Sequence, residues 1–283
     1  MNSGKPDFEP AIGRYLRVDI GGRPYRIYVE QAGEGIPLVC LHTAGSDGRQ
    51  YRGLFNDAET LARFRVIAFD LPCHGKSSPP AGWHKDEYKL TSRSYVDTIM
   101  AVIGALGLDK PVVMGCSIGG RIVLHLALEH ATRFRALIGL QSAAHAEPYY
   151  DLDWLHRPDV HGGEMAGAII SGLISPTAPE ADRWETIWHY MQSGPGVFKG
   201  DLHFYTADGD VRGRVSEIDT GKCPLYLLTG EYDYSATPQI TRELAARIKG
   251  AEAVIMEGVG HFPMSEAPAR FLSYLRPVLA RIK

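Results

Sequence analysis

The stretch Val112-Val-Met-Gly-Cys-Ser-Ile-Gly-Gly120 joins a short apolar run to a serine framed by glycines, in the pattern G-x-S-x-G. The run predicts a buried strand, and the apolar residues after Ser117 repeat at helical spacing. A sharp turn from strand to helix needs small residues at 115 and 119, where side chains would collide with backbone. The turn lifts the Ser117 hydroxyl clear of the sheet and sets it at a helix N-terminus, which favours negative charge. We therefore predict that Ser117 is a nucleophile.

Further short apolar runs lie on both sides of this stretch, each bounded by Gly, Pro or Asp. They cover residues 25–29, 37–41, 65–69, 136–140, 224–228 and 253–256. Several are apolar throughout, as expected for strands that are covered on both faces. Helical patterns at 95–106, 118–130, 239–248 and 267–282 alternate with them. The chain is therefore predicted to be an α/β protein with a mostly parallel sheet and helices on both faces.

Residues 143–213 interrupt this alternation. They contain no buried-strand run, and three of the four tryptophans of the chain fall there, at 154, 184 and 188. A loop of roughly 70 residues without structure would be exceptional, so the segment is predicted to be a helical insertion. We expect a core formed by residues 1–142 and 214–283, and a cap formed by 143–213 that covers the substrate.

A serine hydroxyl is a weak nucleophile near neutral pH, so a base and an orienting acid must lie elsewhere. His261 sits in a glycine-flanked loop after the last predicted strand, at the edge where sites gather in open α/β sheets. The loop after the preceding strand carries Glu231 and Asp233. We predict His261 as the base and Asp233 as the acid, with Glu231 as the alternative. A buried carboxylate would hold the proton on the far ring nitrogen and leave the nearer nitrogen to accept from Ser117.

Stabilisation of an oxyanion requires a second N–H group besides that of Ile118. The small residues of 43–46 follow an early buried strand, so their backbone can approach a ligand closely. We assign the second donor to Ala44, with Thr43 as the alternative. The candidate substrate-binding residues come from this loop, from the insertion and from the position after the base: His42, Trp154, Trp188 and Phe262.

Taken together, these segments resemble the α/β-hydrolase family. The resemblance rests on 42–45 (His-Thr-Ala-Gly), 69–77 (Phe-Asp-Leu-Pro-Cys-His-Gly-Lys-Ser), 115–119, 230–233 and 260–268, which occur in the order found in the family. It implies an eight-stranded, mostly parallel sheet with a helical cap inserted after strand six. It also favours Asp233 over Glu231, because the acid of the family usually lies three residues after the glycine.

Two positions depart from the pattern of the family. Thr43 stands where a glycine often follows the histidine, and Cys73 replaces a glycine in the segment 69–77. The first departure concerns the shape of the oxyanion loop, and the second adds a thiol beside the predicted site. Cys116, next to the serine, is expected to be a packed core group, because successive residues of such a turn point apart.

The residue types limit the chemistry. A serine at position 117 excludes the members of the family that resemble haloalkane dehalogenases or epoxide hydrolases, which use aspartate there. Hydrolysis of a carboxylic ester or lactone with an apolar or aromatic portion is the leading reading, with thioesters as a close variant. Hydrolysis of a carbon–carbon bond in a dienoic diketone is the alternative, although members of that kind usually carry a tryptophan where Phe262 stands. They also need a charged cap residue, for which Arg157, Arg183 and Arg212 are available. A ligand receptor on the same fold is the non-enzymatic reading.

Composition excludes other partners. The 283 residues contain 30 Lys and Arg against 33 Asp and Glu, so no basic excess favours nucleic acid. No apolar run reaches the roughly 20 residues of a membrane span, and the four scattered cysteines predict reduced thiols in a cytoplasmic protein. No metal cluster or nucleotide-binding loop is present in the sequence, so no cofactor is expected, and the substrate is expected to be a small molecule. The sequence does not specify an oligomeric state.

Overall fold

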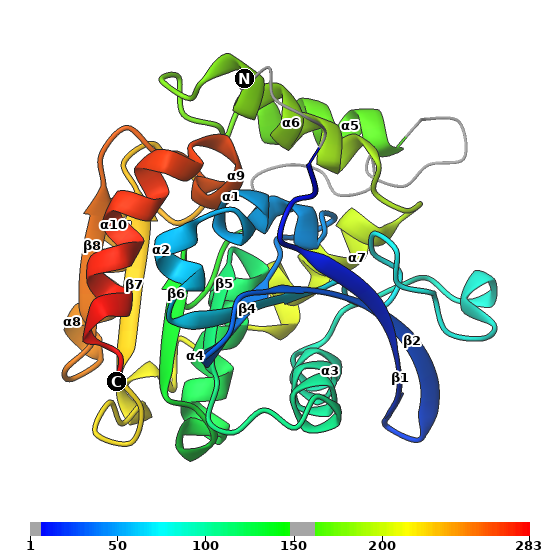
Figure 1. Cartoon of the computed structure of the whole chain (residues 1–283), viewed down its shortest axis with the longest axis horizontal. Coiled ribbons are helices and arrows are strands. Elements are labelled where there is room, and N and C mark those ends of the chain that lie inside the picture. Colours follow the sequence, from blue (N-terminus) through cyan, green and yellow to red (C-terminus); the bar gives the residue numbers. More distant parts are fainter. Residues whose placement is uncertain (1–6, 148–161) are drawn as a thin grey trace.

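An eight-stranded sheet forms the centre of the computed structural model, which describes residues 7–147 and 162–283 (Figure 1). The strand order is β1-β2-β4-β3-β5-β6-β7-β8, and β2 pairs antiparallel with both β1 and β4, whereas all other pairs are parallel. The strands are β1 (Ile12–Ile20), β2 (Arg23–Ala32), β3 (Ile36–Leu41), β4 (Phe64–Phe69), β5 (Val112–Cys116), β6 (Ala136–Leu140), β7 (Leu225–Gly230) and β8 (Glu252–Met256). The predicted fold class is confirmed.

Sequence reasoning missed β1. This edge strand is exposed over its first four residues, alternates exposed and half-buried side chains after them, and carries Arg14, Arg17 and Asp19, so it lacks the apolar run that marks the inner strands. Its position is fixed instead by antiparallel pairing with β2, from Ile12 opposite Gln31 to Ile20 opposite Arg23. An edge strand with charged side chains is typical of sheets that avoid pairing with another chain.

The inner strands are buried on both faces, and each face has its own hydrophobic core. In β5, Val113 packs into one core, whereas Val112 and Met114 pack into the other. The first core is covered by α3 (Ser92–Ala105), α4 (Ile118–Glu129) and α8 (Pro238–Arg247). The second is covered by α1 (Arg52–Phe55) and α10 (Pro268–Arg281), with α2 (Ala58–Leu61) and α9 (Pro263–Glu266) beside them. This three-layer arrangement is what strands without polar alternation require.

Between β6 and β7 the chain forms the predicted helical insertion. It contains α5 (Gly162–Ser171), α6 (Glu180–Met191), α7 (Val197–His203) and the π-helix η5 (Phe204–Asp208). Figure 1 shows α5 and α6 lying across one end of the sheet, next to α9 and α1. Short 3₁₀ turns at Gly48–Tyr51, Trp83–Lys85, Ala131–Arg133 and Val215–Glu217 complete the described elements. The limits 143–213 as a separate domain stay a prediction.

One buried arginine connects both ends of the insertion to α4. The fully buried guanidinium of Arg121 donates to the carbonyl of Ala143 at the start of the insertion, and to the carbonyls of Tyr205 and Gly209 near its end. The N–H of Val211 also donates to the carbonyl of Ala144, at 3.0 Å. The two ends of the insertion therefore lie side by side on the helix that follows Ser117.

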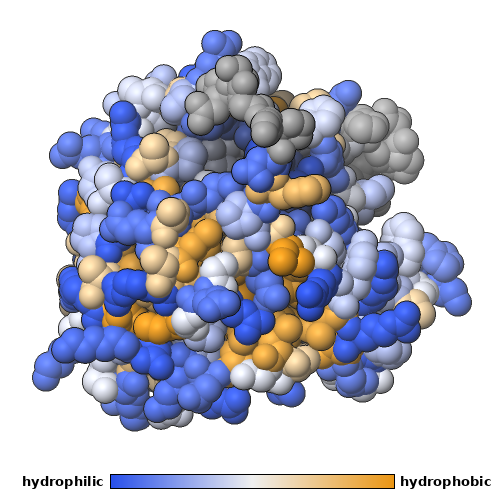
Figure 2. Space-filling view, in the orientation of Figure 1, coloured by the Kyte–Doolittle hydropathy of each residue, from blue (hydrophilic) through white to orange (hydrophobic). Residues whose placement is uncertain are grey.

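On the face shown in Figure 2, hydrophobic residues gather in patches below the insertion, between hydrophilic side chains. In residues 7–147 and 162–283, no helix combines the length and the apolar character needed to cross a bilayer. Within the same residues, no group of three or more His, Cys, Asp or Glu side chains is placed to hold a metal ion.

Candidate active site

Ser117 occupies a strained turn between β5 and α4. Its backbone has φ 60° and ψ −111°, a left-handed conformation that non-glycine residues rarely adopt. The glycines around it are sterically required, as predicted. A Cβ at Gly115 would lie 2.5 Å from the backbone of Gly119, and one at Gly119 would lie 2.8 Å from the carbonyl oxygen of Leu41. The first N–H groups of α4, beginning with Ile118, therefore lie beside the serine without helical partners.

Asp233 and His261 are hydrogen-bonded to each other. Nδ1 of His261 lies 2.9 Å from Oδ1 of Asp233, and the two residues come from the loops after β8 and β7. The same carboxylate oxygen accepts the N–H groups of Ser235 at 2.8 Å and Ala236 at 3.2 Å. Because Asp233 accepts at this position, Nδ1 of His261 carries the proton, which leaves Nε2 as an acceptor. The exposed Glu231 instead accepts the N–H of Gly258.

The serine turn and the histidine loop are in direct contact. Sγ of Cys116 lies 3.3 Å from the carbonyl oxygen of His261. Ser117, Asp233 and His261 are 5%, 2% and 3% exposed, so all three lie in the interior beneath the insertion. Burial raises the pKa of the Cys116 thiol well above its ordinary value, as fits the packed role predicted for it.

Gln141 connects the loop that carries Asp233 to the loop that carries His261. It was not identified from the sequence. It follows β6 with φ 52°, and its side chain is fully buried. Its amide nitrogen donates to the carbonyl of Gly260 at 2.6 Å, and its amide oxygen accepts the N–H of Gly230 at 2.9 Å. The residue before His261 is thus tied to the end of β7, three residues before Asp233. The sequence does carry a signal for Gln141, because it is a polar residue directly after a buried strand.

Glu266 also holds the loop that carries His261. Its buried carboxylate accepts the N–H of Gly260, the N–H of Phe262 at 3.4 Å and the N–H of Ser175 at 3.4 Å. The N–H of His261 donates to the carbonyl of Leu173 at 3.0 Å, so the segment after α5 contacts the same loop. Burial raises the pKa of Glu266 from its ordinary value of 4.5 to about 7, against the opposing effect of the three N–H groups.

The loop 42–46 presents one N–H group that is suited to an oxyanion. The N–H of Thr43 donates to Oε1 of Gln50 at 3.1 Å, and the N–H of Gly45 donates to Oδ2 of Asp201 at 2.8 Å. Within the part of the chain that the structure describes, the N–H of Ala44 has no hydrogen-bond partner. The geometry therefore favours Ala44 over Thr43 as the second donor beside Ile118.

His42 holds the shape of this loop, and the substrate contact expected for it stays a prediction. Its Nε2 accepts the N–H of Leu71 at 3.0 Å, so Nδ1 carries the proton and donates to the carbonyl of Thr43 at 2.8 Å. Burial, followed by the charge of His74, lowers the pKa of His42 to about 4, so the ring is neutral. In a trans peptide, C=O and N–H point in opposite directions. Fixing the carbonyl of Thr43 therefore fixes the direction of the N–H of Ala44.

An aromatic cluster lies between the base and the oxyanion loop. The ring of Phe262 is buried and meets His261 edge to face at 4.9 Å, and it meets Tyr190 of α6 at 5.2 Å. Tyr190 also packs against Phe198 of α7 at 5.9 Å, and its hydroxyl is hydrogen-bonded to Oγ1 of Thr43. A Cβ at Gly45 would lie 2.9 Å from Cβ of Phe198. Sequence reasoning selected Phe262 and missed the two insertion residues.

The insertion tryptophans do not join this cluster. Trp188 is 58% exposed on the outer face of α6, and Trp184 lies on the same face. The substrate contact expected of Trp188 therefore stays a prediction, whereas Tyr190, on the inner face of the helix, contacts Phe198 and Phe262. Trp154, the other predicted contact of the insertion, lies outside the described residues.

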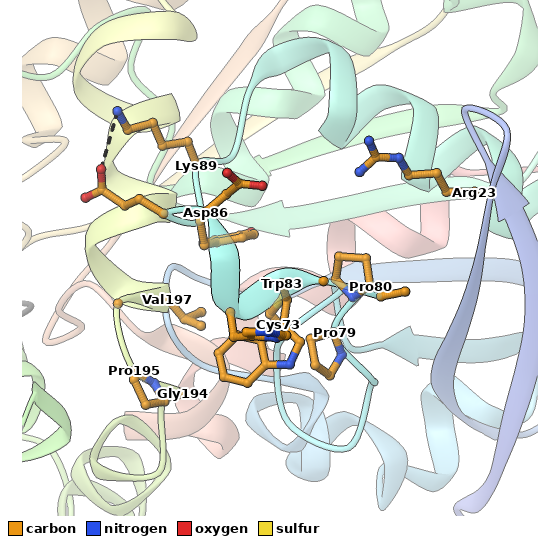
Figure 3. A pocket seen from close by; sticks show the side chains of 16 residues that line it. Arg23, Cys73, Pro79, Pro80, Trp83, Asp86, Lys89, Gly194, Pro195 and Val197 are labelled. Carbon is orange, nitrogen blue, oxygen red and sulfur yellow. Dashed lines mark ion pairs between the residues drawn. The ribbon is translucent and has the colours of Figure 1, made fainter.

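A pocket of about 480 Å³ lies beside the site, between the segment 79–89 and the start of α7. Figure 3 shows Cys73, Pro79, Pro80, Trp83 and Val197 around it. Ser117, Asp233 and His261 do not line it, but Tyr88, which does, donates its hydroxyl to Oδ1 of Asp201 at 3.0 Å. The pocket wall is thus connected to the loop 42–46 through Tyr88 and Asp201, which accepts the N–H of Gly45.

The sequence of this chain matches a known family. The sequence model described as "Alpha/beta hydrolase family" matches residues 38–273. A 2-hydroxy-6-oxononadienedioate/2-hydroxy-6-oxononatrienedioate hydrolase of Klebsiella pneumoniae is 29% identical over 308 residues, which cover 99% of each chain.

Solved structures agree with this assignment. A thermophilic esterase from Thermogutta terrifontis superposes with a TM-score of 0.82 at 20% identity, over 95% of this chain and 99% of that one. Est816, described as an N-acyl homoserine lactone degrading enzyme, superposes with a TM-score of 0.73 at 27% identity, over 93% and 99% of the two chains.

Proposed function

This chain belongs to the alpha/beta hydrolase family, and on that premise we propose that it is a serine hydrolase that cleaves a small carboxylic ester or lactone. The observation that carries the proposal is the buried hydrogen bond between Asp233 and His261, in contact with the strained turn of Ser117. A paired acid and base next to a serine on a strained turn is the arrangement needed to activate a hydroxyl nucleophile.

The steps follow from the groups present. His261 accepts the proton of Ser117 at Nε2 while Oγ attacks the acyl carbon, and Asp233 stabilises the imidazolium that forms. The N–H groups of Ala44 and Ile118 hold the tetrahedral oxyanion. His261 then protonates the leaving alcohol, which gives an acyl-enzyme. Water attacks the acyl-enzyme with His261 as base, and the carboxylic acid leaves. The base must be neutral at the start, so we expect the rate to fall in acid.

The surroundings of the triad support an apolar or aromatic substrate portion. Tyr190, Phe198 and Phe262 form the cluster over the oxyanion loop, and aromatic linings of this kind suit apolar ligands. The similarity to Est816 over nearly the whole chain supports ester or lactone chemistry. The even charge balance supports a small molecule rather than a nucleic acid as partner, and the free cysteines support a cytoplasmic location.

A second function is favoured by the Klebsiella relative, whose name specifies an oxo-dienedioate substrate. Hydrolysis of a dienoic diketone is therefore retained as the alternative. Such a dianion calls for cations, yet Arg212, one of the three candidates, is exposed and pairs with Asp210. Arg183 is half-exposed on α6, and Arg157 lies outside the described residues. We place the ester or lactone reaction first for this reason.

One experiment separates these readings. The purified protein is given a panel of p-nitrophenyl esters graded by chain length, with lactones, thioesters and dienoic diketones alongside. Repeated turnover of esters or lactones, with Ser117 labelled by a fluorophosphonate, supports the proposal. Turnover of diketones alone supports the alternative. Binding of one equivalent without repeated product release would indicate a ligand receptor and contradict both enzymatic readings.

A further inference from the structure

A second buried histidine–carboxylate pair lies next to the oxyanion loop. Nε2 of His74, in the loop after β4, is 2.7 Å from Oδ2 of Asp201 on α7. The side chains are 1% and 0% exposed. The pair therefore links the insertion to the core in a place from which water is excluded, where an ion pair is screened least.

The contacts of His74 require the charged form. Its Nδ1 lies 2.9 Å from the carbonyl oxygen of Pro72, and its Nε2 faces the Asp201 carboxylate, so both nitrogens meet acceptors and both must carry protons. Burial opposes this charge, but Asp201 and, more weakly, Asp70 favour it, and the pKa of His74 is raised. The other titratable groups facing the pair are His42, whose ring lies 4.8 Å from that of His74, Tyr88 and Cys73.

Asp201 also holds the loop that carries the oxyanion donor. Its Oδ2 accepts the N–H of Gly45 at 2.8 Å, and its Oδ1 accepts the hydroxyl of Tyr88 at 3.0 Å. The peptide that follows Ala44 is therefore fixed by Asp201, just as the peptide that precedes its α-carbon is fixed by His42 through the carbonyl of Thr43. With both flanking peptides held, the N–H of Ala44 has one direction.

We propose that the Asp201–His74 ion pair is a positioning device for the oxyanion hole, through which helix α7 of the insertion aims the N–H of Ala44. The inference rests on the proposed serine-hydrolase function. Asp201 and His74 touch neither substrate nor nucleophile in this scheme. They act through Gly45. The charge of His74 lets the Asp201 carboxylate stay buried, and the buried carboxylate accepts the N–H of Gly45. Displacement of α7 would remove that acceptor and leave the loop free to turn.

The test is Asp201→Asn, which preserves shape and removes the charge. Loss of one oxyanion donor typically costs 10²–10³-fold in kcat, so misalignment should lower kcat by about 10- to 100-fold while KM changes by less than about 3-fold. The matched control is Asp57→Asn, which removes the ion pair with Arg276 on the opposite side of the sheet. It should lower the melting temperature and leave kcat unchanged. A wild-type kcat in folded Asp201→Asn would overturn the proposal.

Two further measurements keep the proposal falsifiable if Asp201→Asn does not fold. Tyr88→Phe removes only one donor to Asp201 and should lower kcat by about 2- to 5-fold. In ¹⁵N NMR spectra of the wild-type protein, both ring nitrogens of His74 should be protonated at pH 7, and a neutral ring would overturn the ion pair. If the wild-type protein turns over no ester or lactone, the proposed function fails instead, and a protonated His74 would then describe a structural ion pair only.

Discussion

Sγ of Cys116 lies 3.3 Å from the carbonyl oxygen of His261, so the residue before Ser117 touches the backbone of the proposed base. Cys116 ends β5, whereas His261 lies in the loop after β8, and the two are 145 positions apart in the chain. This contact fixes how closely the loop of His261 approaches the turn of Ser117. A larger residue at 116 would displace the base, which explains why a small, apolar side chain suits this position.

Ser117→Ala should abolish turnover. Loss of a triad nucleophile costs many orders of magnitude in kcat, so we expect less than about a thousandth of the wild-type rate on a p-nitrophenyl ester. The melting temperature should change little or rise, because the hydroxyl is not needed for the turn. Steady-state assays and mass spectrometry of the fluorophosphonate adduct check this result.

The control for that variant is Cys73→Gly. Cys73 is half-buried, lines the adjacent pocket and has φ 73°, so glycine relieves the backbone and removes the thiol. The variant should keep both the rate and the adduct. Turnover that survives in Ser117→Ala and disappears in Cys73→Gly would show that a thiol is the nucleophile.

Gln141→Leu should break the connection between the loop of Asp233 and the loop of His261. The leucine leaves the N–H of Gly230 and the carbonyl of Gly260 buried without partners, at a cost of about 1–3 kcal/mol each. We expect a lower free energy of unfolding in urea and a kcat reduced by at least about tenfold, because Asp233 and His261 lose their common support. Full activity in a folded Gln141→Leu protein would show that the contact is structural only.

Tyr190→Phe and Trp188→Ala distinguish the two faces of α6. Tyr190→Phe removes the hydroxyl that is hydrogen-bonded to Thr43 in the loop 42–46, and we expect kcat/KM to fall by about 3- to 30-fold. The second truncates an outward side chain and should change kcat/KM by less than about twofold. The opposite order of effects would mean that substrate meets the outer face of α6, as the sequence expectation for Trp188 had it.

Glu266 should make stability depend on pH. Its pKa is about 7 in the folded protein and near 4.5 in the unfolded chain, so the folded state binds the proton more tightly between these values. Stability must therefore fall as pH rises from about 4.5 to about 7. The loss is on the order of 2–4 kcal/mol, since each pKa unit corresponds to about 1.36 kcal/mol.

The measurement for Glu266 is the melting temperature across this range. In Glu266→Gln the contribution is absent, so the difference in melting temperature between wild type and variant should drift in favour of the variant as pH rises. A constant difference between pH 5 and pH 8 would refute the shifted titration of this carboxyl group.

The order of strands and helices could be predicted because the inner strands carry apolar residues throughout. The edge strand Ile12–Ile20 could not, since its pairing depends on β2 rather than on its own pattern. Ser117, Asp233 and His261 could be predicted because each follows a predicted strand, and the carboxyl ends of parallel strands share one edge.

The supporting residues needed the folded structure. Asp201 and Tyr190 lie in the insertion, and their partners Gly45 and Thr43 are more than a hundred residues away. Helical spacing places Trp184 and Trp188 on one face of α6, but spacing alone does not say which face is turned inward. Tyr190 and Ile187 take the buried face, and the tryptophans take the outer one.

Arg121 ties both ends of the insertion to one helix of the core. Because one guanidinium donates to the carbonyls of Ala143, Tyr205 and Gly209, the first residues of the segment and its last helix are both tied to α4. A graft that replaced residues 145–204 would retain this anchor but would lose Asp201 and Tyr190, so a foreign insertion would also have to supply partners for Gly45 and Thr43.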